Sequence, residues 1–267
     1  MSSKDIASEP PLSAVAFNAP LKDTDGKEIG PIIFPVLCRL YLAANILQFD
    51  LEPRFSALLF LHRYATAVPR KELAKHRSIE DWKWIGASCL FLACKAEEEP
   101  RRLRDVINLA EMLFVDKDDA NWVTMANNPP GLNEKYWEAK KKMVKTEQLV
   151  LRWMMFDISV AHPHRAVVLL LEKETHRELL IPVAFRRLND ALFYSPALTF
   201  PVLELAVAAI ELAEEEVQAL RRHGINEPNL QQRYKLSRDA VARAKFEINE
   251  ATNILKQSKQ AGKFLKL

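Results

Sequence analysis

Apolar residues recur along this chain at the spacing of a helix, and prolines separate the periodic stretches. Apolar positions that share one helical face in "PVLCRLYLAANILQFD" are Val36, Leu40, Ala43 and Leu47. Proline is tolerated in first turns and loops rather than in helix interiors, so its positions predict helix starts. The first half of the chain is predicted to contain five helices, at 35–49, 54–68, 78–99, 101–114 and 133–158.

The third of these helices differs from the others because its middle is apolar nearly all round. It begins at Ser78, a favourable N-cap that an acidic pair follows, and its apolar run extends from Ile85 to Cys94. A helix with no polar face is surrounded by other elements. We therefore expect a central helix at 82–96. Strand-type alternation and tight hairpin turns do not occur together anywhere in the sequence, which predicts an all-α fold.

The second half of the chain repeats this plan. "GASCLFLACKAEEE" from Gly86 aligns with "AVAAIELAEEEVQA" from Ala206, a shift of 206 − 86 = 120 residues. Small residues then match small ones, which lets neighbouring helices approach a central helix closely. Each copy also follows two proline-bounded helices, which in the second half are predicted at 163–179 and 182–195.

The repeat predicts a second central helix at 202–215 and two domains of about five helices each. The junction is expected near 159–162. The two copies differ at one position of interest, because Lys95 of the first copy falls opposite Glu215 of the second.

Composition narrows the class of protein. The chain has 267 residues, of which 49% are hydrophobic and 27% charged, and only 6 are glycine, which favours a globular helical protein. Its net charge of +3 does not indicate that the protein binds nucleic acid or an anionic membrane. The N-terminus lacks the pattern of a signal peptide, and the longest apolar run is half of what a membrane span needs. We expect an intracellular soluble protein.

Cysteine and histidine do not suggest a metal site. Cys38, Cys89 and Cys94 lie within apolar patterns and are expected to be buried thiols. The "HPH" at 162–164 is distant in sequence from all three, so zinc ligation there is the weaker interpretation.

The apolar run of the first central helix ends at Lys95, and "AEEEPRRLRD" follows. A lysine at such an edge extends its alkyl stem along apolar surface and presents its ammonium group outward. Glu147 begins another apolar helical segment and is able to pair with it. The alternative is that Lys95 is a solvated helix end and Glu147 an ordinary exposed acid.

These residues resemble a known family. "SCLFLACKAEEEPRRLRDVIN" is similar to the third helix of the cyclin box, and "KTEQLVLRWMMFDI" is similar to its fifth helix. The resemblance covers roughly residues 31 to 220. "EEEPRRLRDVIN", "GLNEKYWEAK" and "FDISVAHPHRAVV" resemble transcription-type cyclins, particularly cyclins Q and L. His62 also favours a resemblance to transcription-type cyclins, since mitotic cyclins usually have Asp at this position. The absence of a long arginine-serine tail favours the cyclin Q type over the cyclin L type.

The resemblance implies a fold of two tandem five-helix cyclin-box domains. They are expected at 31–160, which would bind a kinase, and at 161–267, after a flexible tail at 1–30. It also implies a regulatory subunit, without catalytic residues or cofactors, that binds and activates a cyclin-dependent protein kinase in transcription or the cell cycle. Its expected compartment is the nucleus, with the cytoplasm second, and neither nucleic acid nor membrane is an expected partner.

The resemblance also assigns a binding site, position by position. In cyclins, the equivalents of Lys95 and Glu147 lie together and hydrogen-bond main-chain groups of the kinase, and apolar residues beside them cover its αC helix. The implied kinase contacts in this chain are Lys95, Glu147, Leu92, Leu151, Phe156 and Ile158.

Two other classes of protein remain as alternatives. General transcription factors of the TFIIB type also carry two cyclin-like repeats and bind DNA, but they usually add a zinc ribbon and a basic repeat. An enzyme would need a site, and we find no phosphate loop, nucleophile elbow or metal-spaced histidine pair. Arg101, Arg102 and Arg104 are interpreted as a solvated charge run, with an acidic partner as the alternative. The segment 115–131 is expected to be a mobile loop, and the lysines after residue 255 are too dispersed for a nuclear signal.

Overall fold

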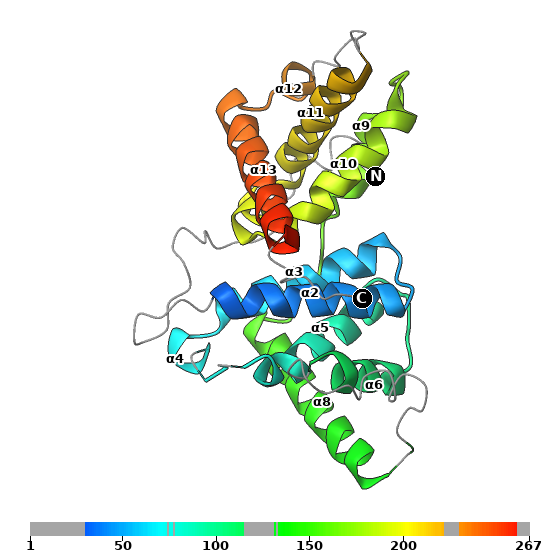
Figure 1. Cartoon of the computed structure of the whole chain (residues 1–267), viewed down its shortest axis with the longest axis vertical. Helices are drawn as coiled ribbons and strands as arrows, with labels where there is room; N and C mark the ends of the chain where they lie inside the picture. The colour runs from blue at the N-terminus through cyan, green and yellow to red at the C-terminus, as the bar shows by residue number, and fades with distance from the viewer. Residues whose placement is uncertain are drawn as a thin grey trace. The chain divides into compact units, whose positions relative to one another are not determined.

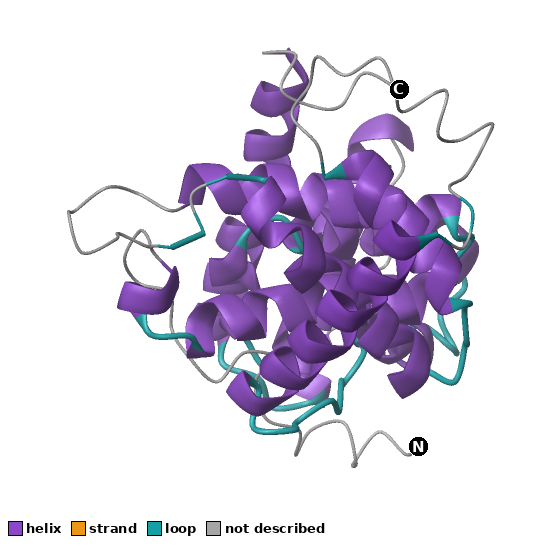
Figure 2. Cartoon of the chain, turned by 90° about the horizontal axis from the view of Figure 1, so that it is seen from below, coloured by secondary structure: helices purple, strands orange, loops and turns teal. Residues whose placement is uncertain are grey.

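The computed structural model describes residues 30–73, 75–76, 78–114, 131, 133–221 and 230–260. Within these ranges the regular elements are helices, and no strand occurs (Figure 2). The predicted all-α class is therefore confirmed. The described residues form two compact units, a first unit at 30–159 and a second unit at 160–260. The predicted tail at 1–30 lies outside the described residues except for Gly30, and the predicted loop at 115–131 does so except for Gly131.

The helices of the first unit surround one central helix (Figure 1). The elements are α2 (Gly30–Ile46), α3 (Leu51–Ala67), α4 (Arg70–Leu73), a 3-10 turn at Glu80–Trp82, α5 (Lys83–Ala96), α6 (Leu103–Leu113) and α8 (Glu134–Trp153). Helix α5 packs against α2, α3, α6 and α8, and its residues from Ile85 to Leu90 are buried. The central helix predicted at 82–96 is thus confirmed.

Local sequence explains how α5 starts and why its neighbours approach closely. The Ser78 amide donates to the Asp81 carboxylate at 2.8 Å, and the Asp81 amide donates to Ser78 Oγ at 3.2 Å, so the two residues bond reciprocally at the 3-10 turn that leads into α5. The N-cap predicted at Ser78 thus belongs to this turn, and α5 itself begins at Lys83. Gly86 then faces Phe114, whose ring would lie 2.9 Å from a Cβ atom at that position. The smallest residue is needed here because the ring occupies the space of a side chain.

Prolines mark helix starts less strictly than the sequence predicted. Pro163 begins α9 (Pro163–Leu170) as expected, but Pro35 lies inside α2 and Pro182 inside α10 (Arg177–Ala191). Each internal proline falls within the first two turns of its helix, so it removes only an early hydrogen bond of the ladder. The predicted break near residue 180 was therefore wrong, and the chain turns at 171–176 instead.

The second unit is built around another central helix, α11 (Val202–Arg221), which packs against α9, α10 and α13 (Arg238–Gln260). A 3-10 turn at Ser195–Thr199 and the short α12 (Leu230–Arg233) complete the unit. The helix predicted at 202–215 is confirmed as its centre, because residues 205–210 are all buried. Two units with matching central helices are what the 120-residue repeat predicted.

The three cysteines are buried thiols, as predicted. Burial raises the pKa of Cys38 and of Cys94 to about 12, so neither is a reactive thiolate at neutral pH. Across the described ranges, no helix combines the length and apolar character that crossing a bilayer requires. No three metal-binding side chains gather within the same ranges.

Candidate functional site

Lys95 occupies the last turn of α5 and reaches across to α8. Its Nζ donates to Oε1 of Glu147, which lies 52 residues further along the chain. The same ammonium group lies 4.4 Å from the centre of the Phe91 ring, a favourable cation–π contact. The Lys95 side chain is 46% exposed and that of Glu147 only 15%, so the pair forms a partly covered charged edge. The structure thus brings together the two charged residues that the sequence singled out.

The four apolar residues of the predicted site differ in exposure. Leu92, one turn before Lys95, is buried, and Leu151 on α8 is half-buried. Phe156 and Ile158 are exposed, although both are large apolar side chains. We call Lys95, Glu147, Leu151, Phe156 and Ile158 the docking surface, as a candidate that the structure does not test. Leu92, the remaining predicted contact, lies in the core.

The sequence predicted a helix that continues to residue 158, but α8 ends at Trp153. Phe156 and Ile158 therefore lie after the helix. Met155 and Phe156 both adopt left-handed backbone conformations, with φ of 56° and 60°. The amide of Phe156 donates to the Leu151 carbonyl at 2.8 Å, which closes the turn. Left-handed φ costs a non-glycine residue about 1–2 kcal/mol. The turn therefore holds Met155 and Phe156, 84% and 66% exposed, in a strained conformation.

Arg63 on α3 anchors the far side of this turn. Its Nη1 donates to the carbonyl oxygens of Asp157, at 3.2 Å, and of Ser159, at 2.9 Å. The Asp157 carboxylate lies 3.9 Å from the same nitrogen. Ser159 Oγ donates to this carboxylate at 2.7 Å, and this hydrogen bond together with the Arg63 charge lowers the pKa of Asp157. Sequence reasoning missed Arg63, since only the neighbouring His62 attracted attention.

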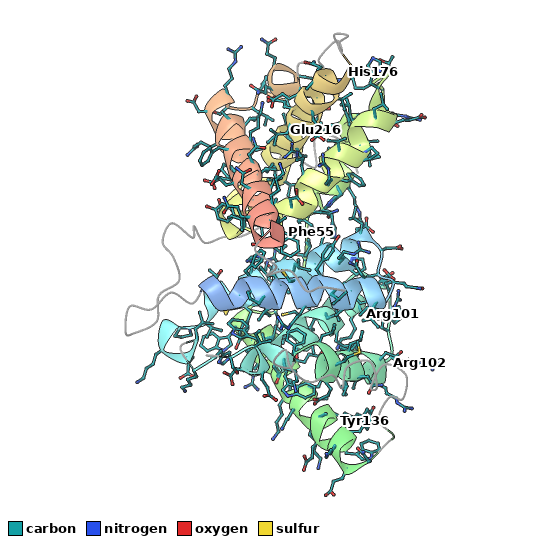
Figure 3. The ribbon with its side chains drawn as sticks, viewed as in Figure 1. Phe55, Arg101, Arg102, Tyr136, His176 and Glu216 are labelled. Atoms are coloured by element: carbon teal, nitrogen blue, oxygen red, sulfur yellow. The ribbon has the colours of Figure 1, made fainter. Side chains whose placement is uncertain are left out.

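The arginines after α5 have different environments. Arg101 donates from Nε to the Leu47 carbonyl and from Nη2 to the Gln48 carbonyl, each at 3.0 Å, and so satisfies the end of α2. It also pairs with Glu99, so it is a structural residue and not part of a solvated run. Arg102 is exposed just before α6 begins. Figure 3 labels the side chains of Arg101 and Arg102.

The second unit has a charge-reversed version of the Lys95–Glu147 pair. Glu215 on the central helix α11 accepts from Nζ of Lys245 on α13 at 2.6 Å. Lys245 also donates to Glu211 at 3.2 Å. The adjacent Glu216, labelled in Figure 3, accepts instead from Arg186, at 2.5 Å. The sequence revealed the Glu215 substitution but not its partner, because the aligned repeat ends before α13.

The paired all-helical units and the charged edge of the first unit define a protein with cyclin-box architecture. Residues 40–159 match the family described as cyclin, N-terminal domain. Cyclin-L1 of Homo sapiens is 30% identical over 184 residues, which are 68% of this chain and 33% of that protein. Cyclin-T1-5 of Arabidopsis thaliana is 33% identical over 159 residues, 59% of this chain and 25% of that protein. The chain thus spans about a third or less of the length of these relatives.

Among solved structures, a chain of the yeast RNA polymerase II CTD kinase CTDK-1 complex has a similar fold. Its TM-score is 0.62 at 21% identity, with coverage of 82% of this chain and 64% of that one. Residues 40–159 therefore form a cyclin N-terminal domain, and the similarity to L-type and T-type cyclins supports a transcription-type member of the cyclin family. The finer assignment to the cyclin Q type stays a prediction. The alternative of a TFIIB-type factor finds no support in these comparisons.

Proposed function

We propose that this chain is the regulatory subunit of a cyclin-dependent protein kinase that acts in transcription. The observations that carry the proposal are the pairing of Lys95 with Glu147 and the exposed apolar residues that follow the end of α8. Exposed apolar side chains next to a partly covered charge pair are typical of a protein–protein interface. The similarity to cyclin-L1 and the occurrence of a similar fold in a CTD kinase complex support the same function.

The proposed mechanism needs no chemistry from this chain. A protein kinase is active when its αC helix turns inward, so that a glutamate on it pairs with the phosphate-binding lysine. The docking surface would cover that helix with Leu151, Phe156 and Ile158, while Lys95 and Glu147 hydrogen-bond main-chain groups of the kinase. Because the surface fits the active arrangement better than the inactive one, binding shifts the kinase population towards activity. The first domain, at 31–160, would bind the kinase, and the nucleus is its proposed compartment.

The test is reconstitution with purified kinases. The chain is mixed in turn with each member of a panel of cyclin-dependent kinases, and phosphorylation of an RNA polymerase II C-terminal-domain peptide is measured. We expect one or a few kinases to become active only in the mixture, and the chain alone to be inactive. Failure to activate any member of the panel, or peptide phosphorylation by the chain alone after kinases are removed, would refute the proposal.

A further inference from the structure

The turn at 154–159 combines two features that folding alone does not favour. Its large side chains Met155 and Phe156 are exposed to water, and their backbones occupy the left-handed region that suits glycine. Other helices of the described chain also end on a left-handed residue, such as Gln48 after α2, but only this turn has two in succession. Strain of this kind persists where the surrounding structure enforces it, and it clusters at functional sites.

Arg63 hydrogen-bonds the chain just after the strained pair. The guanidinium is largely covered, with 17% of its side chain exposed, and its hydrogen bonds reach the carbonyls of Asp157 and Ser159. Asp157 directly follows the strained pair and Ser159 lies two residues further, so the bonds hold the chain where it leaves the turn. The anchor itself is rigid, because α3 packs along the central helix α5. Both bonds come from Nη1, whose two hydrogens lie in the guanidinium plane and therefore point in fixed directions.

We infer that Arg63 is a positioning residue for kinase binding, and that Met155 belongs to the docking surface which Arg63 holds in place. This inference rests on the proposed function and extends it to residues that the sequence did not indicate. Met155 and Phe156 project from the turn as an apolar pair, and the partner must therefore offer an uncharged apolar pocket. Methionine adapts its shape to such a pocket more readily than a branched side chain does.

The energetic reason for an anchor is preorganisation. If the turn were released, Phe156 would leave its left-handed conformation. Met155 and Phe156 would then adopt many orientations. Only the fraction of molecules in the docking conformation binds, so the apparent dissociation constant rises as that fraction falls. Arg63 does not touch the kinase in this scheme and acts only through the turn.

A double-mutant cycle separates this role from a merely structural one. The variants are Arg63→Met, Met155→Ala with Phe156→Ala, and the combination of all three. The measured quantity is the dissociation constant for the purified kinase that the chain activates. We expect Arg63→Met to weaken binding about tenfold in the parent and less than about twofold once the apolar pair is gone. Met155→Ala alone is expected to weaken binding about fivefold.

Hydrogen exchange on the free chain supplies the second readout. In Arg63→Met, exchange of the amides of 155–159 should accelerate, while that of the α3 and α5 amides stays unchanged. If Arg63→Met fails to fold, Arg63→Lys replaces it in the same cycle, since lysine keeps the charge but not the planar group that fixes the direction of the donors.

Several outcomes would overturn the inference. An equal loss of affinity in both backgrounds would show that Arg63 acts elsewhere, and unchanged affinity in Met155→Ala would remove that residue from the surface. If Lys95→Ala weakens kinase binding while Arg63→Met does not, the inference fails and the proposed function stands. If no kinase is activated at all, the proposed function fails and the inference fails with it.

Discussion

Removal of either member of the Lys95–Glu147 pair should separate binding from stability. Lys95 is the more exposed member of the pair, since its side chain is about half exposed whereas that of Glu147 is mostly covered. Exposed ion pairs contribute about 0–1 kcal/mol to folding. Lys95→Ala should therefore change the free energy of unfolding by less than about 1 kcal/mol. A bound kinase would cover the pair, and an unpaired charge in a covered interface costs about 2–5 kcal/mol. Each single variant should thus weaken binding at least about tenfold, mostly through faster dissociation.

The second unit supplies a matched control for this experiment. Glu215 forms a comparable ion pair between a central helix and the helix packed on it, and it is exposed. Glu215→Ala should leave kinase binding unchanged and perturb stability as little as Lys95→Ala does. Surface plasmon resonance gives the dissociation rates, and calorimetry gives the melting temperatures.

A charge exchange sharpens the test further. The double variant Lys95→Glu with Glu147→Lys reproduces in the first unit the arrangement that Glu215 and Lys245 have in the second. It should fold, because an attractive pair is kept, but it should not bind the kinase, because donor and acceptor are presented from the wrong helices. Equal binding by the parent and all variants would refute the docking surface. A large fall in the melting temperature of Lys95→Ala would show instead that the lysine is structural.

Three further predictions concern the stability of the fold. Burial holds the pKa of His164 at about 3, against its usual 6.5, so the unfolded chain takes up a proton that the folded chain does not. The contribution of neutral His164 to the free energy of unfolding should be fully present above pH 6.5 and fall by about 1.4 kcal/mol per pH unit towards pH 3. Urea titrations measure this slope, and His164→Phe should flatten it. Gly86→Ala should destabilise by about 1 kcal/mol in denaturant unfolding, since overpacking against Phe114 outweighs the gain in helix propensity, and Phe114→Leu should relieve the loss. No rescue would disprove this clash. Gln48→Gly should raise the free energy of unfolding by about 1 kcal/mol, because the φ of Gln48 is 53° and glycine adopts that angle without strain. The control Gln48→Ala should not raise it. Equal changes in the two variants would contradict the strain argument.

Most of the helices, both central helices and the charged edge at Lys95 could be predicted from the sequence. These features are local, because the period of apolar residues depends only on near neighbours along the chain. The 120-residue repeat, which aligns Gly86 with Ala206, is also visible in the sequence. Small residues recur at equivalent positions because helices pack closely there. Proline was a weaker guide, because Pro35 and Pro182 are accommodated in early helical turns.

Which side chains meet could not be predicted from the sequence and depends on how the helices pack. Arg63 reaches carbonyls 94 and 96 residues further along the chain, and Glu215 pairs with Lys245 on a helix outside the aligned repeat. No periodicity encodes such pairs, because they depend on the packing of helices that are remote in sequence. The left-handed turn at Met155 and Phe156 was equally hidden, since neither residue prefers that conformation by itself. Contacts made after α8 ends impose it, and those contacts exist only in the folded chain.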